Sequence, residues 1–183
     1  MYGLSLEQSI YVQAKGFHKA AESLVADLDK DPFRATATVT NSAFASELYL
    51  KCLILLETGQ LMKEQHNLRK LFLRLHSSTQ NTIETEFDTE LAKAPELSEE
   101  AKAHLKGRTP PKTLREALAE GGDAFIKWRY IYEDDNHDFF ALFPLPKILA
   151  GVIIARKPEW KDFKLTLGKL VSVPPTSPAQ KTP

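Results

Sequence analysis

The chain has 183 residues, of which 43% are hydrophobic and 26% are charged, as in ordinary globular domains and unlike disordered or collagenous chains. A domain of this length buries enough surface to fold around one core without disulfides or metals. The 24 basic and 24 acidic side chains cancel, which excludes a global field that attracts nucleic acid or anionic lipid, so any such site must be a local patch.

The N-terminal third shows the spacing of two long helices. From Leu6 to Leu28, apolar residues recur at steps of three and four, which predicts an amphipathic helix. Asp31 and Pro32 can cap and begin a second helix, although the poor helix formers at 36–40 favour a later start. From residue 41 the pattern is apolar around most of the circumference until Gly59, a typical stop. We therefore expect the second helix to be the core helix.

Shorter helices are expected in the middle of the chain. Asn67 can cap a helix with an apolar seam and an outward basic face, and residues 83–91 show a further helical stripe that ends before Pro95. A short helix over 98–106 and a connecting loop over 107–111 follow.

The segment after residue 112 predicts another pair of helices. Thr113 and Glu116 form a capping box for a helix that the glycines at 121–122 interrupt, and Asp123 can cap the next one. We expect the helix that follows Asp123 to be a second core helix, because it has an apolar face. This face consists of Phe125, Trp128, Ile131 and Tyr132. Residues 147–156 predict a last helix, with a buried strand as the alternative.

These elements predict an all-α protein, because every strong periodicity is near 3.6 residues. The domain is expected over residues 1–171, followed by a flexible Pro-rich tail over 172–183. One core should contain the following side chains: Phe44, Leu48, Cys52, Leu55, Phe72, Phe125 and Trp128.

The number of cysteines and the lengths of the apolar segments indicate the cellular compartment of the chain. Cys52 is the single cysteine, which excludes an internal disulfide and Cys-based zinc sites and fits a reducing compartment. Residues 1–9 lack the apolar core of a secretory signal, and the longest strongly apolar run, 148–155, is far shorter than the about 20 residues of a membrane helix. We expect a cytoplasmic protein without a membrane span.

The histidines are scattered and no Gly-rich phosphate loop is present, so no metal or cofactor is expected.

Two groups of charged residues are candidates for binding. Glu47 and Lys51 are four residues apart in an otherwise apolar stretch, and they form either a solvated ion pair or a pair that faces a polar group of another helix. Basic residues between 63 and 74 form either a solvated face or a phosphate-binding patch.

Three segments resemble the HEPN superfamily, in its order, within residues 5–155. They are residues 41–51 (NSAFASELYLK), residues 66–72, which begin His66-Asn67-Leu68, and residues 125–133 (FIKWRYIYE). The resemblance implies an up-down bundle of about five main helices, homodimerisation and, in many members, metal-independent RNA cleavage in toxin-antitoxin or defence systems. A nucleotidyltransferase-like antitoxin is then an expected partner. The resemblance places candidate binding residues at Glu47, Lys51, His66 and Glu133.

The catalytic signature of that family is an Arg followed, after four to six residues, by a His. The match here is Arg129 and His137, with seven residues between them and Tyr130 directly after the Arg. On a continuous helix the two side chains lie about 12 Å apart along the axis and about 80° apart around it, so they converge only if the helix ends near Asp134. Arg129 would then stabilise the phosphorane while His137 transfers the proton. Alternatively, Arg129 pairs with Glu133 and the domain is a catalytically inactive module that binds a protein or a nucleotide.

Overall fold

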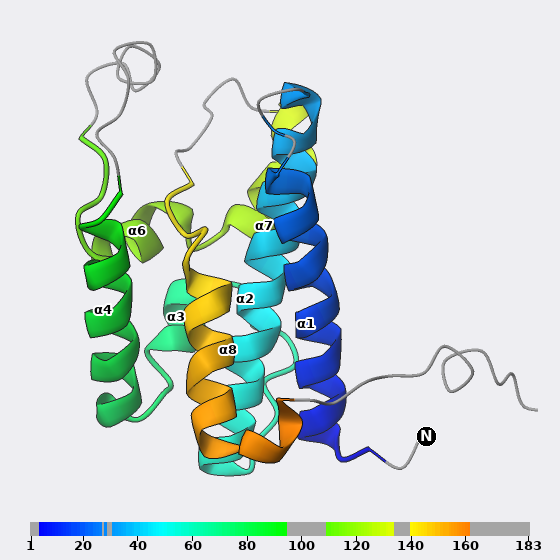
Figure 1. Cartoon of the computed structure of the whole chain (residues 1–183), viewed down its shortest axis with the longest axis vertical. Helices are drawn as coiled ribbons and strands as arrows, with labels where there is room; N and C mark the ends of the chain where they lie inside the picture. The colour runs from blue at the N-terminus through cyan, green and yellow to red at the C-terminus, as the bar shows by residue number, and fades with distance from the viewer. Residues whose placement is uncertain (1–3, 27, 29–30, 95–108, 134–139, 162–183) are drawn as a thin grey trace, which may run out of the picture.

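The computed structural model describes residues 4–26, 28, 31–94, 109–133 and 140–161, which form helices and loops without a strand. The longer helices lie side by side in the order α4, α8, α2, α1 (Figure 1): α1 (Leu6–Val25), α2 (Ala35–Thr58), α4 (Ser77–Leu91) and α8 (Leu145–Arg156). Helices α1 and α4 run in one direction, and α2 and α8 run in the opposite one. Shorter elements complete the bundle: η1 (Pro32–Arg34), α3 (Leu68–Phe72), α6 (Leu114–Gly121), α7 (Ala124–Lys127), η2 (Trp128–Glu133) and η3 (Pro158–Trp160). The predicted all-α fold is confirmed over these residues, and the packing is consistent with a helical bundle. The predicted up-down order does not hold for the neighbours α2 and α8, because these two helices run parallel.

Helix α1 begins at a reciprocal cap. Ser5 Oγ accepts a hydrogen bond from the Gln8 N–H at 3.3 Å, and Gln8 Oε1 accepts one from the Ser5 N–H at 3.0 Å. This arrangement satisfies two backbone donors that a helix start otherwise leaves free. The helix ends at Val25, three residues before the predicted end.

Helix α2 lies at the centre of the bundle. It begins at Ala35 after the 3-10 turn η1, in which Asp31 Oδ1 accepts the Phe33 N–H at 3.2 Å. The threonines that follow do not delay the helix, and Thr38 donates to the Arg34 carbonyl in the preceding turn at 2.9 Å. Gly59 ends α2 in the left-handed conformation (φ 68°), as predicted. By length and hydropathy α2 could cross a membrane, but 78% of its most apolar window is buried inside the protein, as in a core helix.

The main core forms around α2. Of the seven side chains expected there, Leu48, Cys52 and Phe72 belong to its buried cluster. Three aromatic side chains are only partly buried and pack against its edge: Phe44, Phe125 and Trp128. Leu55 is buried but lies outside the contiguous cluster. The predicted core is therefore correct at its centre, and the aromatic side chains occupy its border.

The caps near residues 113 and 123 differ from the prediction. Thr113 Oγ1 accepts the Glu116 N–H at 3.3 Å, but the Glu116 carboxylate accepts from the Lys112 N–H at 2.7 Å, so the box is shifted by one residue. Asp123 does not cap α7. Its carboxylate instead accepts from Asn67 Nδ2 at 2.8 Å, 56 residues away in the sequence.

The predicted second core helix is found only in part, because Phe125 and Trp128 pack against the core but the segment is not one regular α-helix. Helix α7 spans only Ala124–Lys127 and continues as the 3-10 segment η2, which is kinked at Tyr130 (φ −118°, ψ 28°). The missing Asp123 cap and the run of aromatic and β-branched residues, which are poor helix formers, account for the short helix.

The last helix is confirmed as a helix and not a strand. Helix α8 begins two residues before the predicted start, and Pro146 lies in its first turn, where its missing N–H breaks no hydrogen bond. The expected helix over 98–106 and the tail over 172–183 lie outside the described residues.

Candidate functional site

A buried carboxylate on α2 brings together three of the predicted binding residues. Glu47 is 1% exposed, and its Oε1 lies 2.8 Å from Lys51 Nζ and 3.0 Å from His66 Nδ1. Lys51 Nζ also donates to the carbonyl of Lys63 at 3.3 Å. The interpretation of Glu47 and Lys51 as a solvated pair is therefore wrong. The pair does meet other polar groups, as the alternative required, but they belong to the loop before α3 and not to another helix. Glu47, Lys51 and His66 are called the Glu47 cluster below.

The position of His66 follows from how α3 begins. The next residue, Asn67, caps α3 with one side-chain atom and bonds Asp123 with the other. The Leu68 N–H donates to the carbonyl of Gly122 at 2.8 Å. A Cβ at Gly122 would lie only 2.6 Å from a backbone oxygen of the preceding turn, so the close approach requires glycine. These contacts fix the start of α3 against the end of α6. Because His66 directly precedes the cap residue Asn67, they also fix the position of His66 beside Glu47.

The ring of Phe125 lies beside both His66 and Arg129. Phe125 stacks on Phe44 with ring centroids 4.6 Å apart and an interplanar angle of 15°. The guanidinium carbon of Arg129 lies 5.1 Å from the Phe125 centroid and 5.5 Å from that of Tyr130. Phe125 is therefore stacked against Phe44 and is also in cation–π contact with the guanidinium. The His66 ring borders the same side chain at 6.4 Å.

These side chains form a surface next to the Glu47 cluster. Arg129 and Tyr130 are exposed, and the His66 side chain is 44% exposed. We call it the His66–Arg129 surface; it consists of His66, Phe125, Arg129 and Tyr130. It places an imidazole and a guanidinium beside two aromatic rings.

The two oxygens of Glu47 have different environments. Both polar partners, Lys51 and His66, contact Oε1. Oε2 is also buried, and no group within the described residues hydrogen-bonds to it. Lys51, at 7% exposure, supplies the counter-charge that a buried carboxylate requires. The arrangement holds His66 by its ring nitrogen while half of the ring stays accessible.

The remaining predicted site residues are only partly located. Arg129 is on the surface just defined, but the side chain of Glu133 and the whole of His137 lie outside what the structure describes. The Arg129–His137 and Arg129–Glu133 pairs thus stay predictions. The basic residues of α3 are exposed, as both interpretations of that group require.

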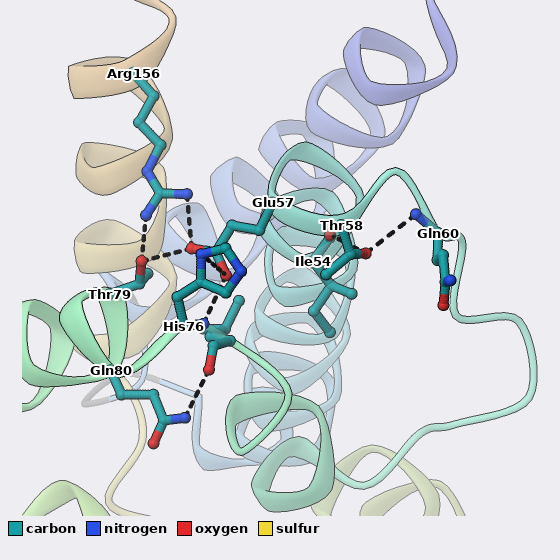
Figure 2. Close-up of polar contacts among 9 residues, drawn as sticks. Ile54, Glu57, Thr58, Gln60, His76, Thr79, Gln80 and Arg156 are labelled. Atoms are coloured by element: carbon teal, nitrogen blue, oxygen red, sulfur yellow. Dashed lines mark hydrogen bonds and ion pairs between the residues drawn. The ribbon is translucent and has the colours of Figure 1, made fainter.

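A second buried carboxylate, Glu57, was missed by sequence reasoning. Its side chain is 4% exposed; Oε1 lies 2.8 Å from Arg156 Nη1 and accepts from the Thr79 hydroxyl, while Oε2 accepts the His76 N–H at 2.7 Å (Figure 2). Arg156 also donates to the Thr79 hydroxyl. These residues are called the Glu57 cluster below. The signal in the sequence was that Glu57 lies in the last turn of the apolar helix α2 and that Arg156 is the last residue of the apolar helix α8.

The pKa of Glu57 reflects two opposing effects. Burial raises the pKa of this carboxyl, but hydrogen bonds from Thr79, the His76 N–H and Arg156, together with the charge of Arg156, outweigh burial and leave the pKa below its usual range. Glu57 is therefore an ionised tie between α2, α4 and α8. A cavity of about 280 Å³ between α4 and α8 borders Thr79 and Arg156.

Other chemistry finds little support in the described part of the chain. No group of His, Cys, Asp or Glu residues there could hold a metal ion. Burial raises the pKa of the Cys52 thiol to about 12, so this core cysteine is not an activated nucleophile. In comparisons with known proteins, no family model, curated protein or solved structure matches this chain.

Proposed function

We propose that this chain is a HEPN-like RNA-binding domain that contacts RNA through the His66–Arg129 surface. The observation that carries the proposal is the meeting of the Arg129 guanidinium and the His66 imidazole at the ring of Phe125. Single-stranded RNA is bound where cationic groups meet phosphates and exposed rings stack on bases. Tyr130, 43% exposed, supplies such a ring.

The burial of Glu47 also supports an anionic ligand. The carboxylate is inside the protein and carries its own counter-ion, Lys51, so its charge does not repel a phosphate at the surface. The exposed side chains of Arg129 and His66 supply the nitrogen groups of this surface. In a chain with no net charge, such a site must be a local patch of this kind.

Arg129→Ala tests this function. A fluorescently labelled single-stranded RNA of random sequence should bind about tenfold more weakly to the variant, since cation and stacking contacts each contribute about 1–3 kcal/mol. The salt dependence of log Kd should fall by about one unit for the lost phosphate contact. The matched control is Arg115→Ala, because Arg115 is 59% exposed on α6 and paired with Glu84. No RNA binding by the wild type, or equal loss in both variants, would refute the proposal.

A catalytically inactive protein-interaction module is the second candidate. Ile126, 44% exposed, lies four residues before the exposed Tyr130, and exposed apolar and aromatic side chains of this kind occur at protein interfaces. The resemblance makes a second copy of the chain or a nucleotidyltransferase-like antitoxin the expected partner. Light scattering at micromolar concentration should then report a dimer that Ile126→Ser weakens. A monomer would count against homodimerisation.

A further inference from the structure

We infer that the exposed face of α3 and of the turn after it is a contact surface for an anionic lipid bilayer. The face consists of Arg69, Lys70, Leu73 and Arg74, all of which are exposed, and we call it the α3 surface. It shares no residue with the His66–Arg129 surface and does not depend on RNA binding there. It combines three cationic side chains with one apolar side chain.

Helix geometry places the leucine among the cations. The backbone stays helical beyond the end of α3, because the Leu73 N–H donates to the Arg69 carbonyl at 3.1 Å and the Arg74 N–H donates to the Leu71 carbonyl at 3.0 Å. Leu73 then lies about 40° around the axis from Arg69 on one side and about 60° from Lys70 on the other. The opposite face of the same segment is buried and consists of Leu68, Leu71, Phe72 and Leu75.

The cations of the α3 surface are available to an external partner. Within the described residues, none of its three basic side chains pairs with a carboxylate. Three arginines elsewhere lie 3.1, 2.6 and 2.8 Å from a carboxylate oxygen, and they are Arg34, Arg115 and Arg156. In a chain without net charge, the α3 surface is therefore a local positive patch.

The exposed leucine favours a bilayer over a nucleic acid. Leu73 is 48% exposed, and the α3 surface contains no aromatic ring on which a base could stack. An anionic bilayer accepts both kinds of side chain, because its headgroups attract Lys and Arg while the region below them takes up an apolar group. The long stems of Lys and Arg also let their charges stay at headgroup level when the leucine inserts.

The number of groups predicts a weak and reversible contact. Each basic side chain near an anionic membrane surface raises the partition coefficient by about fivefold, so three of them raise it by about 10²-fold. One leucine adds a smaller apolar contribution. The α3 surface thus holds the protein at a charged membrane surface without inserting a helix.

Cosedimentation with lipid vesicles tests the inference. Wild type should sediment with phosphatidylcholine vesicles that contain about one third phosphatidylserine, and much less with phosphatidylcholine alone. Salt at about 0.5 M should remove most of the binding, because the Debye length falls to a few ångströms. Lys70→Glu should lower the partition coefficient by about 25-fold, since the charge changes by two units. Leu73→Ser should lower it by about threefold or more.

Two control variants make the same changes elsewhere. Lys93→Glu reverses a charge on a side chain that is 64% exposed, and Leu6→Ser removes a leucine that is 49% exposed. Both should bind vesicles within about twofold of the wild type. Thermal unfolding confirms that each variant is folded, and Lys70→Glu decides the charge contribution even if Leu73→Ser is not.

Three results would overturn the inference. One is equal binding of the wild type to both kinds of vesicle. Another is unchanged binding of Lys70→Glu, or a loss that Lys93→Glu shares in full. The third is a wild type that ignores vesicles but binds labelled single-stranded RNA with an affinity that Lys70→Glu lowers, which assigns the α3 surface to nucleic acid instead.

Discussion

Two buried glutamates, ten residues apart on α2, have opposite surroundings. Both oxygens of Glu57 accept hydrogen bonds, whereas Glu47 has both partners on Oε1 and none from the described residues on Oε2. The partners of Glu57 come from α4 and α8, so this carboxylate ties three helices together. Glu47 holds the side chain of His66, which remains half exposed. A buried charge can thus connect helices in one place and hold a partly exposed imidazole in another.

The two nearby histidines show the same contrast. His76 is attached to Glu57 through its backbone N–H at 2.7 Å, with the ring nitrogen 3.9 Å away. His66 is attached to Glu47 through the ring nitrogen at 3.0 Å. Only His66 has its ring orientation set by a carboxylate. The following predictions test this difference through stability.

Lys51→Met should have the largest effect. Removing the ammonium leaves the carboxylate of Glu47 buried with only His66, so the free energy of unfolding should fall by about 3 kcal/mol, near the lower end for a broken buried ion pair. Urea denaturation measures the change. The double variant Lys51→Met, Glu47→Leu should recover most of it, because no buried charge remains. A loss below about 1 kcal/mol would place the pair in solvent.

Arg156→Ala should come next. Glu57 would keep its bonds from Thr79 and the His76 N–H but lose its charged partner, at a cost of about 1–3 kcal/mol. The control is Lys93→Ala in the exposed pair with Glu90, which should change stability by less than about 0.5 kcal/mol. Equal effects of the two variants would show that Glu57 does not tie the helices.

The lowered pKa of Glu57 predicts acid sensitivity. Its folded-state pKa lies below the unfolded value, so its stabilisation is present above the unfolded pKa of about 4.3 and is lost as the pH falls through the folded pKa. Glu57→Gln should therefore be less stable than the wild type at pH 7, with a difference that shrinks below about pH 4. Thermal unfolding across this range measures the difference. A gap that stays constant with pH would contradict the shift.

The histidines should give the smallest effects on stability. His66→Ala removes one hydrogen bond to Glu47 while Lys51 remains, so a loss of about 0.5–1.5 kcal/mol is expected. His76→Ala keeps its backbone bond to Glu57 and should stay within about 0.5 kcal/mol of the wild type. If His76→Ala loses more stability than His66→Ala, then the ring held by its buried carboxylate is that of His76 and not that of His66. Chemical denaturation of both variants under one condition decides this.

The helices were predictable where local signals agree. The end of α2 at Gly59 and the cap of α3 at Asn67 follow from residues next to the helix itself, and periodicity fixes their apolar faces. The prediction failed at α7, because Asp123 hydrogen-bonds to Asn67 and no longer acts as a local cap. A side chain with two possible partners cannot be assigned from its neighbours in the sequence.

The spacing of four residues places Glu47 and Lys51 on one helix face, because residues four apart are neighbours on any α-helix. The packing of the folded chain buries this face and brings His66, 19 residues from Glu47, within hydrogen-bond distance of it. It also decided that Phe125 and Arg129 lie beside that histidine. Burial depends on which elements cover α2, and contacts between distant residues depend on loop paths, so neither is encoded in local spacing.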